Sequence, residues 1–547
     1  MKALSMKTTA MRLALVAVVF AGPAFFLASC TDLGETAFSE VDPENFFQTE
    51  AEVTAALAPV YAQLRATLWA YHNVTQVSSD ESIVPTRGQD WQDGGRWLQM
   101  HRHTWDANLL DLNDAWVASY TGVARANGLL QNLETVDVPD KELIVAEIRA
   151  LRAYYYYQLL DLFGSVPVVG DEEGEFLADP DNPPASESRQ AVYDFIVSEL
   201  DAVRQVLPPT ASVFGRMTSG AADAMLANLY LNADVFTSTS TEISTTGYNS
   251  CADTGTCQAA VDAVDRILAS PANYVLVDDW RSNFVPDNES HPEHIFVVQH
   301  AAVEGLGVNF AMRYMHYNQF SPSPWNGFST IAETYNAFED TDQRKDVFLV
   351  GQQINFQTGE EAEDRNGNPL IFSPDCGDVS NTTESACARI AKFSPDVDAA
   401  GGDGHSNDYA FFRLGEMYLI KAEALNELGR TAEAIDLINE LRERVFKADT
   451  DGDGNPDADL EDFLLDAADY DQASLRARIL DERLYELMYE AKRRQDLVRY
   501  GVFDDEWEYK EVVGEDHRVL FPIPQVQRDA NPNLCQNPGY GGSNVCT

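Results

Sequence analysis

The chain has 547 residues, of which 45% are hydrophobic, and its 88 acidic and 38 basic side chains give a formal charge of −50. The apolar fraction is ordinary for a globular protein, so we expect a large core, whereas the charge repels phosphates and excludes nucleic acid as a partner. Because such a chain repels itself until salt screens the charge, the composition fits a saline habitat. The simpler alternative is an acidic surface that only keeps the protein soluble.

The chain begins with an export signal. A positively charged start precedes an apolar stretch, Leu13 to Leu27, that is shorter than the ~20 residues of a membrane-spanning helix. Small residues and then Cys30 follow, an order similar to the lipobox of bacterial lipoproteins, in which the cysteine is acylated. We predict a signal peptide over 1–29, a lipid on Cys30 as the only membrane attachment, and a tether over 30–41; an ordinary cleaved signal is the alternative.

Helical periodicity dominates both ends of the remaining chain. Apolar residues recur at helical spacing in a set of segments that we predict to be helices: 44–67, 107–135, 140–163, 187–206, 218–235, 257–270, 407–428, 431–447 and 473–500. Residues 271–405 are rich in Pro, Gly, Asn and Asp, so they are expected to form loops with short strands, for example at 294–300.

Two of the predicted helices form a hairpin. Arg413 to Tyr418, a turn at Gly429 and the run Ala432 to Ile435 resemble a tetratricopeptide hairpin with a lengthened first helix. Such hairpins stack and bury their apolar faces between neighbours. The predicted fold is therefore mainly α, with tetratricopeptide-like hairpins packed on an irregular portion that contains short strands. We expect a single body over 42–547, with this organisation: helical 42–270 and 407–502, loop-rich 271–405, and extended 503–547.

Six cysteines remain after Cys30, and they lie in three close pairs in turn-rich sequence. Six cysteines allow 15 connectivities, but disulfides suit an exported protein, and the Cys-x-x-Cys spacing of a zinc site is absent. The sequential pattern predicts three local disulfides: Cys251 with Cys257, Cys376 with Cys387, and Cys535 with Cys546.

An acidic run at 449–459 resembles a calcium loop. Oxygen-bearing side chains and a glycine occupy the positions of the first half of an EF-hand loop, although Leu460 stands where a bidentate carboxylate is expected. We predict a structural calcium ion, with no catalytic cofactor, against the alternative of a solvated acidic turn. The predicted ligands are Asp449, Asp451, Asp453, Asn455 and Asp457.

Eight stretches of the chain, in order, resemble the SusD/RagB family of nutrient-binding outer-membrane lipoproteins. The most specific is Ala150 to Tyr157 with Phe163 to Pro167. The others are Asn45 to Tyr61, Trp116 to Asn127, Thr218 to Leu231, Phe338 to Arg344, the hairpin from Arg413, Glu482 to Tyr500, and Pro522 to Tyr540. The resemblance implies a helical body that captures a nutrient, usually a glycan, at the cell exterior. It also implies delivery to a TonB-dependent, SusC-like β-barrel transporter.

The sequence shows no catalytic motif of the common hydrolase or nucleotide-binding classes, so we predict that the chain is not an enzyme. His101 and His103 could chelate a metal, but a pair of solvated polar residues is the simpler interpretation. A surface-anchored glycan-degrading enzyme and a structural adhesin remain the alternatives to a nutrient-binding protein.

A glycan needs exposed aromatic rings with a few polar side chains beside them. Trp105 and Trp116 lie in predicted core positions, whereas two polar loops carry aromatic side chains without helical spacing. By resemblance, family ligand sites draw on loops from these two regions. The predicted ligand-binding residues are Trp91, Trp97, Tyr317, Trp325 and Asn326, flanked by Asp80 and Arg96. Alternatively, these aromatic side chains cover the core of the body or face the transporter.

Overall fold

The computed structural model describes residues 49–170, 176–179, 181–239, 241–399, 404–446, 460–511 and 516–546, and Glu50–Thr547 form one compact unit. The predicted signal peptide, Cys30, the tether and the calcium run at 449–459 lie outside the described residues. Among the residues described, no helix combines the length and the apolar character needed to cross a bilayer.

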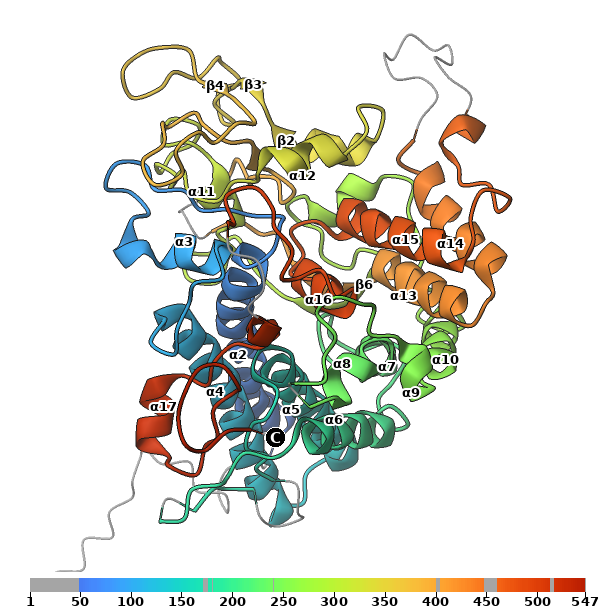
Figure 1. Ribbon diagram of the computed structural model, residues 1–547. Coiled ribbons are helices and arrows are strands. Elements are labelled where there is room, and N and C mark those ends of the chain that lie inside the picture. The colour runs from blue at the N-terminus through green and yellow to red at the C-terminus, as the bar shows by residue number, and fades with distance from the viewer. Residues whose placement is uncertain are drawn as a thin grey trace, which may run out of the picture. The chain divides into compact units, whose positions relative to one another are not determined.

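The predicted mainly α fold is confirmed. Long helices pack on their neighbours in chain order, α2 on α4, α4 on α5, and onward through α6, α7 and α10 to α13, which contacts both α14 and α15 (Figure 1). Their bounds are α2 (Glu50–Val77), α4 (Leu110–Glu134), α5 (Lys141–Phe163), α6 (Arg189–Val203), α7 (Ser219–Leu231), α10 (Cys257–Leu268), α13 (Leu414–Glu427), α14 (Thr431–Glu443) and α15 (Gln472–Leu487).

Shorter helices connect these elements. The α-helical ones are α3 (Arg96–His101), α8 (Ala233–Thr237), α9 (Cys251–Thr254), α11 (Phe310–Tyr314), α12 (Ala332–Ala337), α16 (Arg493–Arg499) and α17 (Gln525–Ala530). The 3-10 turns are η1 (Asp93–Gly95), η2 (Trp280–Phe284), η3 (Gln343–Val347), η4 (Leu460–Phe463) and η5 (Asp516–Val519). Because α17 and η5 lie within 503–547, the prediction of a wholly extended C-terminal segment is wrong.

Helix α5 is buried on all sides over its second half. The four consecutive tyrosines Tyr154 to Tyr157 are each 0% exposed, so burial alone cannot satisfy their hydroxyl groups. Tyr155 donates to the carbonyl of Val60 at 2.5 Å, and Tyr157 donates to the side chain of Asn228 at 2.8 Å. A Cβ on Gly122 of α4 would lie 2.6 Å from the Tyr155 ring, so glycine permits the close approach of the two helices.

Three two-stranded antiparallel sheets accompany the helices: β1 (His294–Val298) with β6 (Tyr409–Arg413), β2 (Phe348–Leu349) with β5 (Arg389–Ile390), and β3 (Gly351–Gln352) with β4 (Ile371–Phe372). The strand expected at 294–300 is therefore present. The helix predicted over 407–428 is wrong at its start, because β6 pairs with β1 before α13 begins. Its aromatic side chains are all buried and suit a strand.

The helix predicted over 473–500 is also wrong in one respect, because it breaks between α15 and α16. Tyr489 and Ala491 have φ angles of 63° and 60°, outside the helical region. Their N–H groups donate to Glu81 at 3.0 Å and to Gln76 at 3.2 Å. Side chains at the end of α2 and just beyond it thus replace the helix carbonyls as acceptors.

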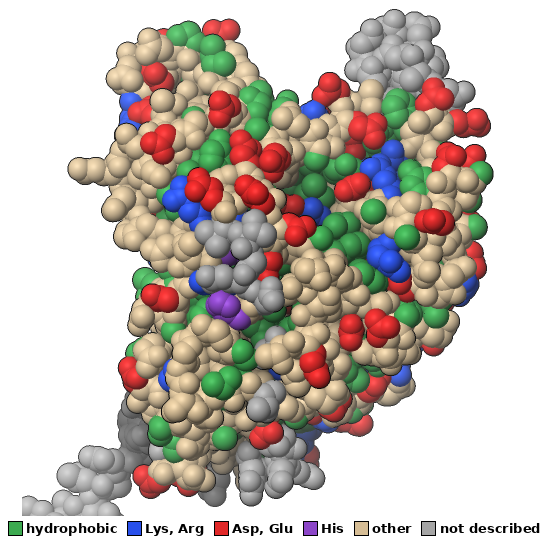
Figure 2. All heavy atoms as spheres, viewed as in Figure 1, with side chains coloured by type: hydrophobic (Ala, Val, Ile, Leu, Met, Phe, Trp, Pro, Cys, Tyr) green, Lys and Arg blue, Asp and Glu red, His purple; other side chains and the backbone are tan. Residues whose placement is uncertain are grey.

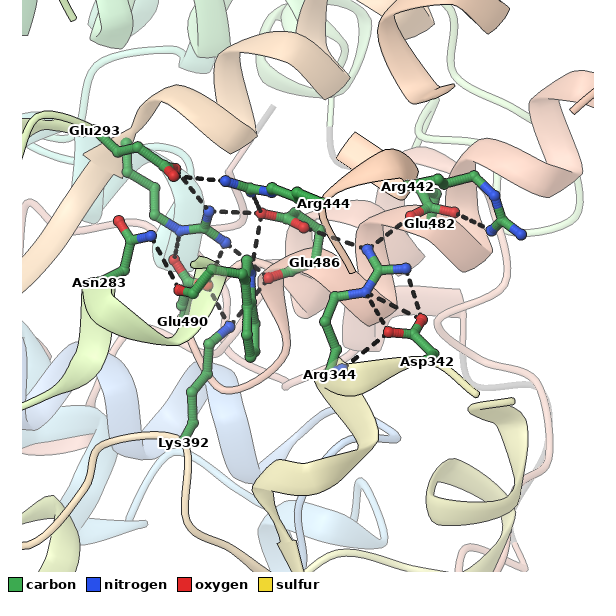
Figure 3. A network of polar contacts seen from close by, with 12 residues as sticks. Asn283, Glu293, Asp342, Arg344, Lys392, Arg442, Arg444, Glu482, Glu486 and Glu490 are labelled. Carbon is green, nitrogen blue, oxygen red and sulfur yellow. Dashed lines mark hydrogen bonds and ion pairs between the residues drawn. The ribbon is translucent and has the colours of Figure 1, made fainter. Parts of the chain in front are cut away.

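Buried ion pairs join β6, η3 and α14 to α15 (Figure 3). Glu486 is 0% exposed, accepts from Arg413 at 2.7 Å and lies 3.2 Å from Arg344. Glu482 and Glu490 extend the network on either side, as Glu482 pairs with Arg344 at 2.7 Å and Glu490 pairs with Arg413 at 2.7 Å. By contrast, the face in Figure 2 carries Asp and Glu side chains spread over its surface.

The three predicted disulfides are confirmed: Cys251 with Cys257, Cys376 with Cys387, and Cys535 with Cys546. Each closes a short loop, and the second lies in the loop-rich portion near the predicted ligand-binding residues.

Candidate ligand-binding site

The two aromatic loops predicted to bind ligand lie against each other. Trp91 donates its indole N–H to the carbonyl oxygen of Trp325 at 2.6 Å. Tyr317 donates its hydroxyl to the carboxylate of Asp90 at 2.5 Å. The side chains of Trp91, Tyr317 and Trp325 are half-buried, so each ring is partly accessible. We call this surface, formed by Asp90, Trp91, Tyr317, Trp325, Arg365 and Glu384, the aromatic site.

Trp91 is held in an unfavourable backbone conformation. Its φ angle is 61°, a left-handed value that is an outlier for a bulky residue and costs on the order of 1–3 kcal/mol. The ring packs over Gly327, where a Cβ would lie 2.3 Å from the indole. It also contacts Trp97 and Phe328, with ring centroids 5.5 and 5.8 Å away. Packing therefore offsets the strain and fixes the ring.

Charged groups lie beside the rings. The Arg365 guanidinium carbon lies 4.1 Å from the centroid of the Tyr317 ring. The same side chain pairs with Glu384 at 2.5 Å and lies 3.7 Å from Asp90. Asp90 and Arg365 have exposed fractions of 43% and 48%, so both can exchange water for ligand hydroxyls.

The protonation states at neutral pH follow from burial and hydrogen bonds. Burial and the bond to Asp90 raise the pKa of Tyr317 to about 12, so the phenol stays a donor. Burial lowers the pKa of His316 despite its contact with Glu384, so the imidazole is neutral. Burial would raise the pKa of Glu384, but bonds from His316 and Arg365 outweigh it and lower the pKa. The aromatic site therefore offers one cation, two carboxylates and a phenol.

Two buried arginines support the loops from beneath. Arg87 donates to the carbonyls of Gly327 at 3.2 Å and Ala386 at 3.0 Å. Arg389 donates to the Asn326 side chain at 2.9 Å and to the Cys387 carbonyl at 2.5 Å. Their partners are mainly main-chain oxygens, which have no sequence signal, so sequence reasoning missed both residues, together with Arg365 and Glu384.

Two predicted ligand contacts are not exposed. Trp97 is 2% exposed because α3 turns its ring against Phe328, and its indole N–H donates to Asp93 at 2.8 Å. Asn326 is 0% exposed, and its amide donates to the Glu384 carbonyl at 3.0 Å. The expectation of exposed side chains is therefore wrong for Trp97 and Asn326, whose roles are to hold the loops.

The predicted flanking residues have structural partners. Both carboxylate oxygens of Asp80 accept from Arg493, at 2.8 and 2.7 Å, so Asp80 already has a structural partner. Arg96 lies over the Trp97 ring at 4.6 Å and 3.6 Å from Asp111. Neither side chain contacts Trp325 or Tyr317 in any described interaction.

The prediction of a solvated histidine pair is wrong. His101 is 0% exposed, with ring nitrogens 3.1 Å from the Ser82 carbonyl and 2.9 Å from the Glu508 carbonyl. His103, 4% exposed, lies 2.8 Å from the Ser78 carbonyl. Within the described ranges, no group of three or more His, Cys, Asp or Glu side chains is arranged to hold a metal.

Two family models match the chain. The model described as the SusD family matches residues 292–540, and the model described as starch-binding associating with outer membrane matches residues 37–231. The chain belongs to the SusD family. The resemblance carried by the sequence motifs is thereby confirmed.

SusD-family relatives are similar along most of the chain. SusD-like protein P2 of Formosa agariphila is 23% identical over 535 residues, which cover 94% of this chain and 97% of the relative. The starch-binding protein SusD of Bacteroides thetaiotaomicron is 23% identical over 520 residues, which cover 86% of this chain and 85% of the relative.

Solved SusD-like structures have the same fold. A laminarin binding SusD-like protein superposes with a TM-score of 0.68 at 22% identity and covers 90% of this chain and 100% of its own. Surface glycan-binding protein A from Bacteroides thetaiotaomicron, in complex with laminarihexaose, gives a TM-score of 0.65 at 18% identity, with coverages of 89% and 99%. At these identities the likeness establishes the fold of this chain.

Proposed function

We propose that this chain binds a glycan at the aromatic site and does not cleave it. The observation that carries the proposal is Trp91, a bulky residue held at positive φ and bonded to the Trp325 carbonyl beside two further half-buried rings. Backbone strain of this kind is retained where it positions a side chain for function. Sugar rings present flat CH faces and many hydroxyls, which suit partly exposed aromatic rings with charged side chains at their edge.

A neutral glucan fits this site best. The accessible charged groups of the aromatic site are Asp90, Glu384 and Arg365, two carboxylates against one guanidinium, an arrangement that does not favour an anionic polymer. A glucan is also supported by the similar proteins, which include a starch-binding protein, a laminarin binding protein and a glycan-binding protein in complex with laminarihexaose.

The proposed cellular role adds an anchor and a partner. A lipid on Cys30 would attach the chain to the outer membrane, facing the cell exterior, and the family model that associates starch binding with the outer membrane supports this location. Delivery of the bound glycan to a TonB-dependent, SusC-like β-barrel transporter is the expected next step, in keeping with the family.

One assay separates this function from the alternatives. The purified chain is incubated with a panel of neutral polysaccharides, and both retention and chain length of each polymer are measured. A binding protein retains at least one polymer intact, a glycan-degrading enzyme shortens it, and an adhesin without a glycan ligand retains none. Shortened products or a lack of retention across the panel would each refute the proposal.

A further inference from the structure

A cavity separate from the aromatic site lies between α2 and α11, lined by Arg65, Trp69, His300, Asn309 and Arg313 with neighbouring apolar groups. Its volume is about 270 Å³, just below the range of roughly 300–1,000 Å³ that drug-sized ligands fill. We call it the Trp69 cavity. It has room for a single small ring rather than for a chain of them.

The wall of this cavity contains an exposed tryptophan. Trp69 has an exposed fraction of 39%, whereas Trp97, Trp105 and Trp116 are buried. The Arg313 guanidinium carbon lies 3.5 Å from the centroid of the Trp69 ring. One face of the indole is thus occupied by a cation, and the exposed remainder is available to a ring stacked from the cavity.

The charge of the lining is opposite to that of the chain. Among the residues that the structure describes, no Asp or Glu lines the Trp69 cavity, although acidic residues outnumber basic ones by 88 to 38 in the sequence. Arg65 donates to the Gln299 carbonyl at 3.4 Å. Arg313, 1% exposed, donates to the side chains of Asn309 and Asn73, each at 3.1 Å. Among the described ion pairs, none includes either arginine.

The buried Arg313 remains charged at neutral pH. Burial lowers the pKa of Arg313 only to about 10, so the guanidinium keeps its proton. Burial and the nearby Arg65 lower the pKa of His300 to about 3, so the imidazole adds no charge. Asp408 accepts the His300 backbone N–H at 2.7 Å but does not line the cavity. Two guanidinium groups therefore line a space that can hold an anion. Arg313 is buried and has no counter-charge among the described ion pairs, and such a buried cation is costly.

We infer that the Trp69 cavity binds one sugar ring that carries a carboxylate or a sulfate, with the ring on Trp69 and the anionic group at Arg65 and Arg313. Guanidinium groups bind carboxylate and sulfate-like oxyanions with directed, charge-assisted hydrogen bonds. A neutral sugar would leave both cations without a counter-charge, so the cavity selects for the anion.

This inference goes beyond the proposed glucan binding and stands on different residues. The two sites share α11, because the N–H groups of Gly327 and Phe328 donate to the Arg313 carbonyl at 2.7 and 3.0 Å. The aromatic site presents two carboxylates, whereas the Trp69 cavity presents two guanidinium groups. A glycan with a neutral backbone and acidic branches would satisfy both.

The test uses the purified full chain and three small probes, methyl β-D-glucuronide, methyl β-D-glucoside 6-sulfate and methyl β-D-glucoside, in ligand-observed NMR titrations. The glucuronide or the sulfate should bind about tenfold or more tightly than the glucoside, and added NaCl should weaken that binding. Trp69→Ala and Arg65→Gln should each lower the affinity for the anionic probe about tenfold. The control Arg430→Gln removes the same charge from an arginine that is 42% exposed and should change nothing.

Equal affinity for all three probes would overturn the inference, as would an anionic probe whose binding survives both Trp69→Ala and Arg65→Gln. Inorganic sulfate is the competitor that separates a sugar from a bare anion. If sulfate displaces the anionic probe at equal concentration, the cavity is an anion site and the sugar assignment is wrong. The Trp69→Ala chain keeps the aromatic site, so its retention of a neutral polysaccharide tests glucan binding alone. A failure of the Trp69 cavity proposal can therefore be told apart from a failure of the proposed function.

Discussion

Removing the charge of Glu486 should destabilise the protein more than any surface change of the same kind. This carboxylate is 0% exposed, and it accepts from Arg413 at 2.7 Å and from Trp280 at 3.1 Å, with Arg344 at 3.2 Å (Figure 3). Glu486→Gln keeps the size of the side chain, so no cavity forms. It leaves buried arginines short of a counter-charge, a loss of about 3–5 kcal/mol.

The magnitude is measured by urea unfolding followed by circular dichroism, with the shift in midpoint multiplied by the slope of the transition. The matched control is Glu433→Gln, because Glu433 pairs with Arg430 at 2.5 Å but is 56% exposed. Water and salt screen that pair, so the urea midpoint of Glu433→Gln should equal that of wild type within error. Equal shifts in the two variants would refute the claim that the buried network stabilises the fold.

The pH dependence gives a second test of the same residue. Burial would raise the pKa of Glu486, but Arg444, Arg413 and Arg344 outweigh it and hold the pKa well below the usual value of 4.5. A depressed folded pKa contributes stability that is present above the unfolded pKa and lost as the pH falls. The difference in the free energy of unfolding between wild type and Glu486→Gln should therefore be constant near neutral pH and shrink below about pH 4.5. A difference that grows in acid would contradict this account.

Three further predictions concern other regions. Burial raises the pKa of Glu81 from 4.5 to about 8, so the stability that protonated Glu81 contributes is complete below the unfolded pKa and is lost as the pH rises. At pH 7 the Glu81→Gln variant should therefore be more stable than wild type by about 3 kcal/mol. A wild type that is equally stable at pH 5 and pH 8 would contradict this prediction. In calorimetry, calcium added to chelated protein should give a heat of binding, because the acidic run at 449–459 offers oxygen ligands. No heat at millimolar calcium would exclude the ion. A Cys30→Ser chain should leave the membrane fraction, whereas unchanged partitioning would exclude the lipid anchor.

Most long helices could be predicted from apolar spacing, since α4, α5, α10 and α14 each begin and end within a few residues of the expected bounds. The errors occur where distant contacts decide the conformation. Tyr409–Arg413 is an apolar run that fits a strand or a helix equally well, and only β1 decides between them. The break after α15 depends on Gln76 and Glu81, which lie far away in sequence.

The aromatic site was predictable in part. Trp91, Tyr317 and Trp325 stand out because they lie in polar loops without periodicity. Trp97 follows in the same part of the sequence as Trp91 but is buried, because its ring packs against Phe328, which lies far away in sequence. The packing of Trp91 over Gly327 also means that Trp91→Ala would disturb the fold as well as a ligand, so it is a poor test of binding.

Affinity for the retained polysaccharide, measured by calorimetry on Trp325→Ala and Arg365→Gln, tests the central claim most directly. Leu110→Ala is the control, because it truncates an apolar side chain that is 56% exposed on α4. Loss of a sugar-stacking ring or of its polar neighbour should cost about 1–3 kcal/mol, roughly five- to 150-fold in affinity, and Leu110→Ala should bind as wild type does. Wild-type affinity in both Trp325→Ala and Arg365→Gln would contradict glycan binding at the aromatic site.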